Sequence, residues 1–320
     1  MEIESKVSEG IDGSITIKEA EKNLLTLLRK EKLCIFAGSG ISVAAPSSLP
    51  TWDGFIDKYK EICKKICKEK KTKKFDDIIS NVNKFKNRDI VGTATALSDI
   101  IASFKKAGIN MKPYTSEMVD IFANKKSNSY HEAIVKTNYK YILTTNYDDL
   151  LEKAARAKGY NELLNRVYSH YDIKEISEAI YKNESAIIHM HGIYTTDIVI
   201  DEFIFTKEDY KRIKEKNPGF RTLMNAIFMN YSILLVGYGS SDPHLEDIID
   251  DLNMILKWHG SEDTLELPCY YLLILKDKLS PIFDHNKDKN RTKVIPVDEY
   301  DDMLALLKRL QKKQPRKIKK

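Results

Sequence analysis

The chain has 320 residues, of which 42% are apolar and 31% are charged, and this composition excludes disordered and fibrous proteins. Its longest apolar runs, such as residues 231–239, are far shorter than the roughly 20 residues of a membrane span. The first ten residues also lack the apolar core of a signal peptide. The four cysteines are few and scattered, which is typical of a reducing compartment, so we expect a cytoplasmic protein.

The net charge of +5 is concentrated at one end of the sequence. Eight of the 52 basic residues and none of the 47 acidic ones lie in residues 308–320, which leaves 44 basic against 47 acidic residues elsewhere. A second lysine-rich stretch covers residues 64–74. Lysine-rich tails are usually solvated ends, with a nucleic-acid or partner contact as the alternative. Because no aromatic residues are interleaved as in an RNA-binding stretch, we do not expect direct binding of nucleic acid.

Short apolar runs alternate with amphipathic segments along the chain. The predicted helices cover residues 17–31, 147–159, 219–230 and 243–260, and the predicted strands cover residues 33–38, 141–146, 186–192, 232–239, 269–275 and 293–297. The strand runs are continuous rather than alternating, as expected when helices cover both faces of a parallel sheet. The sequence therefore predicts an α/β fold with a doubly wound, mostly parallel, Rossmann-like sheet and right-handed crossovers.

The interval between the first two predicted strands is far longer than a crossover requires. It covers about residues 45–137, is rich in helix-compatible residues and is poor in strand signals. We therefore predict one domain over residues 1–320 with a helical subdomain inserted after the first strand, at 56–135. Residues 17–55 and 136–300 form the Rossmann-like core of this prediction, and residues 308–320 form a basic tail.

Four of the predicted strands end in turns that carry glycine or polar residues, at the edge where open α/β sheets bind ligands. The first turn is FAGSGIS at 36–42, in which Gly38 and Gly40 allow the backbone to approach a ligand. The segment that follows can present N–H groups to a phosphate, and a plain tight turn is the alternative. The turn does not match the dinucleotide fingerprint of dehydrogenases, because Val43 occupies the third glycine position.

The second turn is TTNYD at 144–148, directly after an apolar strand. Asn146 and Asp148 are two residues apart, so both can face the crevice at the strand end. Asp148 can equally serve as an N-terminal residue of the next helix, where the helix dipole favours a carboxylate. For Asn146, helix capping and ligand contact require different side-chain directions, so the structure can separate them.

The third turn is HMHG at 189–192, and the fourth is VGYGSSD at 236–242. Alternation along a strand places His189 and His191 on the same face. A buried core histidine is the usual explanation, but His191 lies nearer the crevice and is the better candidate for a base. In the fourth turn, glycine and serine can contact phosphate or ribose hydroxyls, and Asp242 either binds ligand or caps the helix that Pro243 begins.

Taken in order, GSGIS, TTNYD, HG and VGYGSSD resemble the nucleotide-binding core of the sirtuin family. The resemblance extends over scattered motifs from about residue 33 to 275. Sirtuins bind NAD between a Rossmann-like domain and a smaller domain inserted early in the chain, which is similar to the long interval here. The resemblance implies two catalytic residues, Asn146 for the reacting ribose and His191 as the base. It also implies an NAD-binding set: Gly38, Ser39, Gly40, Ser42, Thr145, Asp148, Gly237, Gly239, Ser240 and Asp242.

Several departures separate this chain from the protein deacetylases of the family. Those members carry a four-cysteine zinc site, whereas Cys63 and Cys67 have no second pair, so we expect no metal. Thr145 replaces the family's glutamine. The loop after the first motif is replaced by residues 47–55, in which Trp52 either covers the pocket or packs the helical subdomain. These variations resemble the bacterial sirtuin-like proteins of antiphage defence, which consume NAD.

The resulting hypothesis is an NAD+ hydrolase that releases nicotinamide and ADP-ribose and acts in antiphage defence by depleting NAD. A protein deacylase with the same pocket, and a non-catalytic sensor that binds NAD or ADP-ribose, are the alternatives. Because such an effector must be silent until infection, we expect a homo-oligomer or a separate partner protein to control it.

Overall fold

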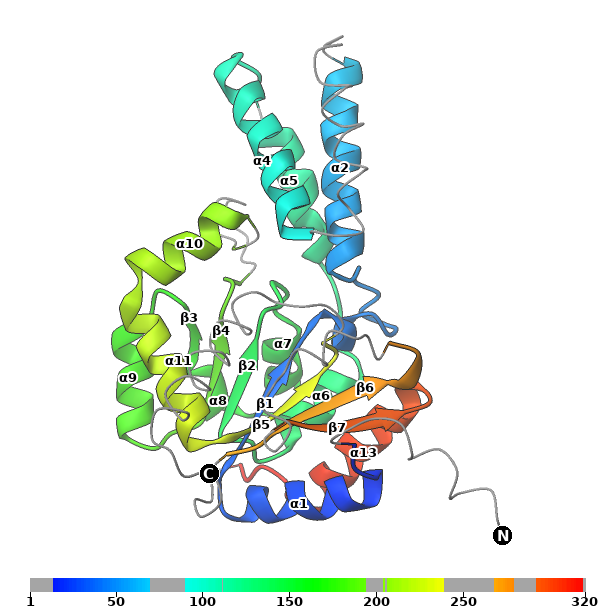
Figure 1. Cartoon of the computed structure of the whole chain (residues 1–320), viewed down its shortest axis with the longest axis vertical. Coiled ribbons are helices and arrows are strands. Elements are labelled where there is room, and N and C mark those ends of the chain that lie inside the picture. The colour runs from blue at the N-terminus through cyan, green and yellow to red at the C-terminus, as the bar shows by residue number, and fades with distance from the viewer. Residues whose placement is uncertain are drawn as a thin grey trace.

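The computed structural model describes residues 14–69, 90–110, 112–193, 204, 206–238, 268–278 and 292–318. Their centre is a seven-stranded sheet in the order β3-β4-β2-β1-β5-β6-β7, in which every neighbouring pair is parallel. The predicted α/β Rossmann-like fold is therefore confirmed (Figure 1). The strands are β1 (Leu33–Ala37), β2 (Tyr141–Thr144), β3 (Val167–Ser169), β4 (Ala186–His189), β5 (Ser232–Val236), β6 (Tyr270–Leu275) and β7 (Thr292–Val297).

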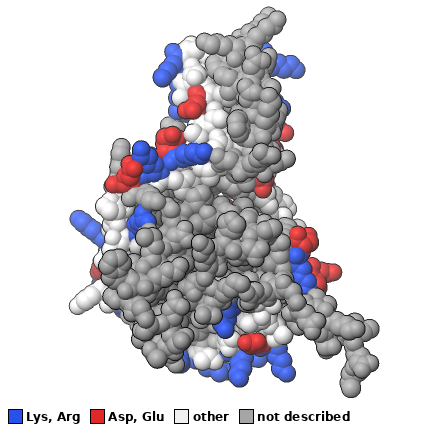
Figure 2. Space-filling model, viewed as in Figure 1, with Lys and Arg blue, Asp and Glu red and all other residues white. Residues whose placement is uncertain are grey.

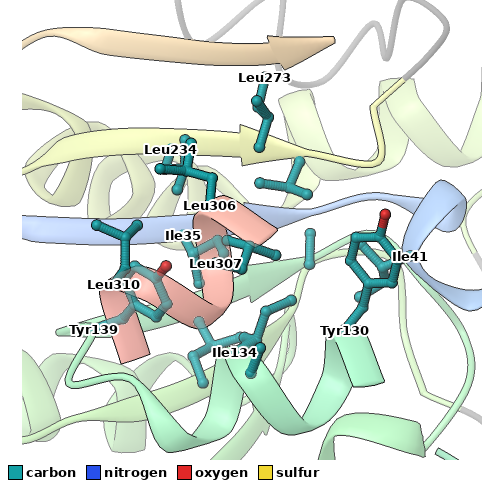
Figure 3. Close-up of a cluster of buried hydrophobic side chains, with 14 of the residues drawn as sticks. Ile35, Ile41, Tyr130, Ile134, Tyr139, Leu234, Leu273, Leu306, Leu307 and Leu310 are labelled. Atoms are coloured by element: carbon teal, nitrogen blue, oxygen red, sulfur yellow. The ribbon is translucent and has the colours of Figure 1, made fainter. Parts of the chain in front are cut away.

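Helices pack on both faces of this sheet, because successive strand residues point to opposite sides. Ile35 of β1 faces a core that contains Ile134 and Leu306, whereas Phe36 faces a second core with Phe220 and Phe228. Figure 3 shows the first of these cores. Its helices are α1 (Ile17–Arg29), α6 (Ser129–Lys136), α7 (Leu150–Ala157), α8 (Asn161–Leu164) and α13 (Tyr300–Lys313), and those of the other core are α9 (Ile173–Tyr181), α10 (Lys207–Lys216) and α11 (Pro218–Asn230).

The chain between β1 and β2 forms a helical arm that projects from the sheet (Figure 1). The arm consists of α2 (Trp52–Glu69), α4 (Ile90–Lys106), α5 (Lys112–Val119) and the 3-10 helix η3 (Asp120–Phe122). It has a hydrophobic core of its own, which reaches Tyr147 and Leu150 at the end of β2. Helix α6, by contrast, packs on the sheet. The exact limits of an inserted subdomain at 56–135 stay a prediction.

The basic end of the chain is attached to the core at two residues, Leu310 and Arg316. Residues 308–313 are the last turns of α13, and Leu310 is fully buried. Arg316 is half-buried, and its guanidinium donates hydrogen bonds to the carbonyls of Val135 (3.0 Å) and Tyr139 (2.8 Å). Burial lowers the pKa of Arg316 to about 10. The described lysines of this segment, Lys308, Lys312, Lys313 and Lys317, are exposed, so Leu310 and Arg316 hold the segment in place while its lysines remain in solvent.

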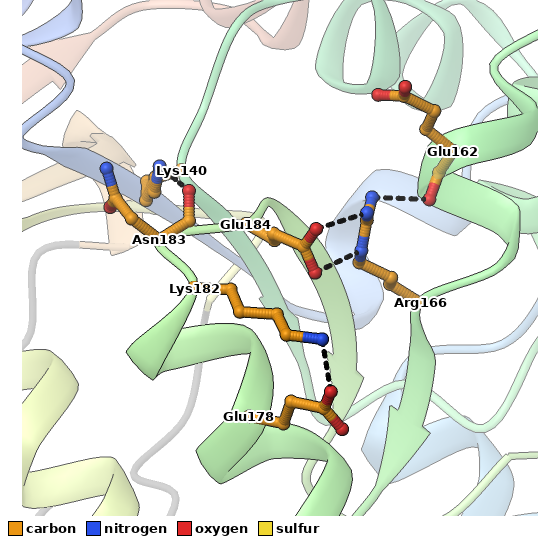
Figure 4. A network of polar contacts seen from close by, with 7 residues as sticks. All are labelled: Lys140, Glu162, Arg166, Glu178, Lys182, Asn183 and Glu184. Carbon is orange, nitrogen blue, oxygen red and sulfur yellow. Dashed lines mark hydrogen bonds and ion pairs between the residues drawn. The ribbon is translucent and has the colours of Figure 1, made fainter.

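Charged side chains of both signs are interspersed over the described part of the face in Figure 2, and Lys and Arg gather at its lower edge, over α1. An ordered polar network lies at the amino ends of β2, β3 and β4 (Figure 4). There Arg166 donates two hydrogen bonds to Glu184, at 2.9 and 2.7 Å, and Lys140 donates one to the carbonyl of Asn183. No helix among the described residues is long and apolar enough to cross a bilayer.

Candidate functional site

The turns that follow β1, β2, β4 and β5 meet around one cavity at the carboxyl ends of the strands. Strands β2 to β4 lie on one side of β1 and β5 to β7 on the other, so the strand order reverses at β1. Such a switch point is where open α/β sheets bind ligands. The cavity contains eight of the predicted site residues: Gly38, Ser39, Ser42, Thr145, Asn146, Asp148, His191 and Gly237. Gly40 packs directly beneath it, while Gly239, Ser240 and Asp242 lie outside the described residues.

The turns after β1 and β5 are in backbone contact. The N–H of Gly38 donates to the carbonyl of Val236, and the N–H of Gly40 donates to the carbonyl of Gly237, both at 2.9 Å. A Cβ on Gly38 would lie 2.6 Å from the oxygen of Gly237, and one on Gly40 would lie 2.8 Å from its Cα. Gly237 has a φ of +69°, a conformation that L side chains rarely adopt. Glycine is therefore required here by the close approach of two main chains.

Asn146 lies in an irregular segment between β2 and α7, and its side chain turns back toward the first turn of the site. Its Nδ2 is 3.3 Å from the carbonyl of Gly38 and 3.4 Å from Oγ of Ser42. The side chain therefore does not cap α7, and it borders the cavity. The residue is 7% exposed, and its Oδ1 has no hydrogen-bond partner among the described residues. A buried amide oxygen without a partner is costly, and it is a ready acceptor for a hydroxyl in the cavity.

Asp148 contacts the start of α7 and also lines the cavity. One carboxylate oxygen accepts from the N–H of Leu150 at the start of α7 (3.2 Å), and the other accepts from the hydroxyl of Ser42 (2.9 Å). Burial raises the pKa of Asp148 to about 6, although the hydrogen bond from Ser42 opposes this rise. The carboxyl group therefore titrates close to neutral pH at the wall of the cavity.

The sequence analysis did not identify His131, which contacts Ser42 and so supports the hydrogen bond between Ser42 and Asp148. The N–H of Asn128 donates to Nδ1 of His131 (3.1 Å), so that nitrogen carries no proton. Burial lowers the pKa of His131 to about 3, and the neutral ring then donates from Nε2 to Oγ of Ser42 (3.1 Å). The hydroxyl of Ser42 is thereby directed at Asp148. The capping pattern from Asn128 to His131 was visible in the sequence, but it gave no sign of Ser42, 89 residues away.

The two histidines of the HMHG motif have different surroundings. Strand β4 ends at His189, which contacts Asn146 and Glu152, so the alternation predicted from the sequence stops before His191. His191 lines the cavity, is 3% exposed and meets the ring of Tyr210 edge-on at 5.4 Å. Burial lowers the pKa of His191 to about 3. The imidazole is therefore neutral at physiological pH and able to accept a proton.

Aromatic side chains close the cavity on the side of the helical arm. Trp52 lines the cavity and also stacks on Phe55, with ring centroids 5.9 Å apart and planes at 13°, so both roles proposed for it apply. Phe122 and Tyr147 continue the same wall, and the hydroxyl of Tyr147 donates to the carbonyl of Ile204 (2.8 Å). The arm thus supplies an apolar surface against the polar strand ends. Phe122 was not predicted, because nothing in the local sequence links it to β2.

The described residues hold no group of three or more His, Cys, Asp or Glu side chains arranged for a metal ion. Cys63 and Cys67 lie on the buried face of α2, inside the core of the helical arm. Burial raises the pKa of Cys63 to about 12, so this thiol remains protonated. The two cysteines therefore act as small apolar core residues in this structure.

Sequence comparisons bear on this same strand-end site. Residues 140–258 match the SIR2-like domain. The match begins just before β2 and includes Asn146, Asp148, His191 and Gly237, so the resemblance to sirtuins is confirmed over that part of the chain. The chain is also similar to defense-associated sirtuin 2 of Bacillus subtilis, with 24% identity over 246 residues, which cover 76% of this chain and 20% of that protein.

Two further relatives are named NAD(+) hydrolase ThsA. The protein from Cytobacillus dafuensis is 23% identical over 323 residues, which cover 94% of this chain and 56% of the relative. The protein from Enterococcus faecium is 22% identical over 316 residues, which cover 92% and 58%. The chain thus spans a little over half the length of the ThsA relatives and a fifth of the length of the Bacillus subtilis protein.

Proposed function

We propose that this chain hydrolyses NAD+ to nicotinamide and ADP-ribose at the cavity formed by the turns after β1, β2, β4 and β5. The single observation that carries the proposal is the buried Oδ1 of Asn146, an acceptor with no partner among the described residues, in the same cavity as His191. A sugar hydroxyl is the natural donor for such an oxygen. The names of the ThsA relatives, which cover 92–94% of this chain, support the choice of NAD+ as substrate.

The reaction needs an oriented ribose and a group that accepts one proton. When the bond between ribose and nicotinamide breaks, nicotinamide leaves with the electron pair and positive charge develops on the ribose, as in glycoside hydrolysis. The oxygen of a water molecule then bonds to that carbon and releases one proton. In this proposal Asn146 orients the ribose through Oδ1, and its Nδ2 stays anchored on the first turn by the carbonyl of Gly38.

His191 is the proposed base for that proton. The substrate-free imidazole has a pKa lowered to about 3 by burial, so it is a weak base that is always available in its neutral form at pH 7. A weak base suffices, because water becomes strongly acidic while it bonds to a cationic carbon. The aromatic wall of Trp52 and Tyr147 supports the proposal in a second way, since an apolar surface suits a nicotinamide ring and keeps other water molecules away.

We further propose that the hydrolase acts in bacterial antiphage defence in the cytoplasm, by depleting NAD. The name of the Bacillus subtilis relative supports this role. Unrestrained hydrolysis would also deplete the NAD of the uninfected cell, so a partner protein or assembly into a homo-oligomer is proposed to control the activity. This regulation is tested by expressing the protein in bacteria with and without phage infection. Size-exclusion chromatography then detects an oligomer or a bound partner, and cellular NAD is measured in the same cultures.

The experiment that tests the proposed activity follows nicotinamide and ADP-ribose by chromatography after the protein is incubated with NAD+. Asn146→Ala and His191→Ala are each expected to lower product release by about a hundredfold or more. Asn165→Ala, an exposed residue after α8 and away from the cavity, is the matched control and should behave as the wild type. Full activity in both site variants would refute the assignment. Binding of NAD+ without release, with or without infected-cell extract, would indicate a sensor instead of a hydrolase.

A further inference from the structure

We propose that His189 and Glu152 form a buried positioning pair that fixes the main chain of Asn146 and thereby holds its amide in the cavity. The inference rests on the proposed function, because it assigns a role to residues behind the same site. Neither residue lines the cavity, and neither is among the residues that the sirtuin motifs implicate.

The contacts form an unbroken chain from α7 to Asn146. Oε1 of Glu152 is 2.9 Å from Nε2 of His189, and Nδ1 of the same ring is 3.0 Å from the carbonyl oxygen of Asn146. His189 is fully buried and Glu152 is 7% exposed. The N–H of Asn146 is also held, because it donates to Oγ1 of Thr144 at 3.0 Å. Both main-chain polar groups of Asn146 are thus bound by side chains instead of by a neighbouring strand.

This arrangement matters because Asn146 lies in a segment with no regular secondary structure, between the end of β2 and the start of α7. Without the ladder of a sheet or helix, the peptide groups around Asn146 would be free to rotate. The direction of its side chain depends on those rotations, and an error of about 1 Å at a reacting group can cost a hundredfold in rate. In place of the missing ladder, His189 donates one hydrogen bond to the carbonyl of Asn146.

The same contacts fix where the protons lie. A carbonyl oxygen only accepts, so Nδ1 of His189 must carry a proton and donate it to Asn146. A second proton lies between Nε2 and Oε1 of Glu152. Burial alone would lower the pKa of His189, but the charge and hydrogen bond of Glu152, with the Asn146 carbonyl and Asp148, raise it overall. Glu152 thus keeps the ring in the orientation and protonation state that serve Asn146.

A purely stabilising role explains the pair less well. Taking two ionisable groups out of water costs several kcal/mol, and their attraction often fails to repay that cost compared with apolar residues of similar size. In addition, Oε2 of Glu152 has no hydrogen-bond partner among the described residues. A pair that is expensive to bury and is directed at the backbone of a site residue is what positioning requires.

The test uses isosteric variants that separate the two bonds of the ring. In His189→Asn the amide nitrogen takes the place of Nδ1 and can still donate to Asn146, whereas in His189→Gln it takes the place of Nε2 and that bond is lost. We expect His189→Gln to lower kcat for NAD+ hydrolysis about 10- to 100-fold with KM changed less than about threefold. His189→Asn should stay within about fivefold of the wild-type kcat.

Glu152 provides a second, independent pair of variants. In Glu152→Gln the amide can donate to Nε2, so the proton on Nδ1 and the bond to Asn146 remain, and kcat should be close to that of the wild type. Glu152→Leu removes the anchor of the ring and should lower kcat in the same direction as His189→Gln. The control is Glu184→Gln, which breaks a bidentate ion pair with Arg166 at the opposite edge of the sheet (Figure 4) and should leave kcat per folded molecule unchanged.

Wild-type kcat in His189→Gln, or an equal fall in both histidine variants, would overturn the inference. A crystal structure of His189→Gln gives a second readout that needs no turnover: the amide of Asn146 should leave the carbonyl of Gly38, and an unmoved amide would refute the role. If His189→Gln does not fold, the two Glu152 variants carry the same comparison. Full activity in Asn146→Ala would instead refute the proposed function itself, so the two failures are distinguishable.

Discussion

Substitution of Gly237 by alanine tests the contact between the turns after β1 and β5, on which the shape of the site depends. An added Cβ would lie 2.7 Å from the nitrogen of Ile41 and 2.9 Å from its Cγ2, and the residue has a φ of +69°. Two penalties therefore act together. One is conformational, because alanine is disfavoured at positive φ, and the other is steric, because main-chain atoms of the first turn must move.

Two matched variants separate these penalties. Gly159 has nearly the same φ, +75°, but nothing lies within 4 Å of an added Cβ, so Gly159→Ala should cost only the conformational part, about 1–2 kcal/mol. A Cβ on Gly40 would meet the backbone of Gly237 at 2.8 Å, and the φ of Gly40 lies outside the disfavoured range, so Gly40→Ala should cost only the packing part, about 1–3 kcal/mol. Gly237→Ala should then cost about 2–5 kcal/mol.

The assay is urea denaturation of the three variants and the wild type, followed by circular dichroism, with the free energy of unfolding obtained by linear extrapolation. NAD+ hydrolysis per folded molecule is measured in parallel. We expect activity to fall in the Gly40 and Gly237 variants and to persist in Gly159→Ala. If Gly237→Ala is no less stable than Gly159→Ala, the two turns are not in the close contact described here, and the argument for glycine at this site is refuted.

Three further predictions concern titration, the packed end of the chain and the thiols. In the folded protein the pKa of Asp148 is raised to about 6 from 3.8, so the folded state binds more protons than the unfolded state between these values. The contribution of Asp148 to stability should therefore fall as pH rises from about 4 to about 6. Denaturation without NAD+ should show Asp148→Asn gaining stability relative to the wild type across that window. A constant difference between the two proteins would contradict this prediction. Arg316→Met should cost about 2–4 kcal/mol of unfolding free energy, because two enclosed carbonyls lose their donor, with turnover per folded molecule unchanged. Of the four thiols, Cys269 alone is not fully buried, so a thiol reagent should label it quickly in the native protein and label the others only after unfolding.

The sequence by itself predicted six of the seven strands and the edge of the sheet at which the candidate cavity lies. Six predicted strands match β1, β2 and β4 to β7 within a few residues, because a strand buried on both faces is a continuous apolar run that needs no partner to be recognised. Strand β3 was missed, since Val167–Ser169 is short and only half-buried at the edge of the sheet. The turns after the strands were also recognisable, because glycine and polar residues at strand ends are local features of the chain.

Only the tertiary structure decided how these turns act together. It brought Ser42 within hydrogen-bond distance of Asp148 across 106 residues, and His189 within reach of Glu152 across 37. It also bound Arg316, within the lysine-rich end, to the carbonyls of Val135 and Tyr139. The reason is physical: local patterns report which backbone conformation a segment prefers and which side is apolar. The partner of a buried polar atom, by contrast, is set by how distant elements pack, and desolvation by that packing is what shifts each pKa in the site.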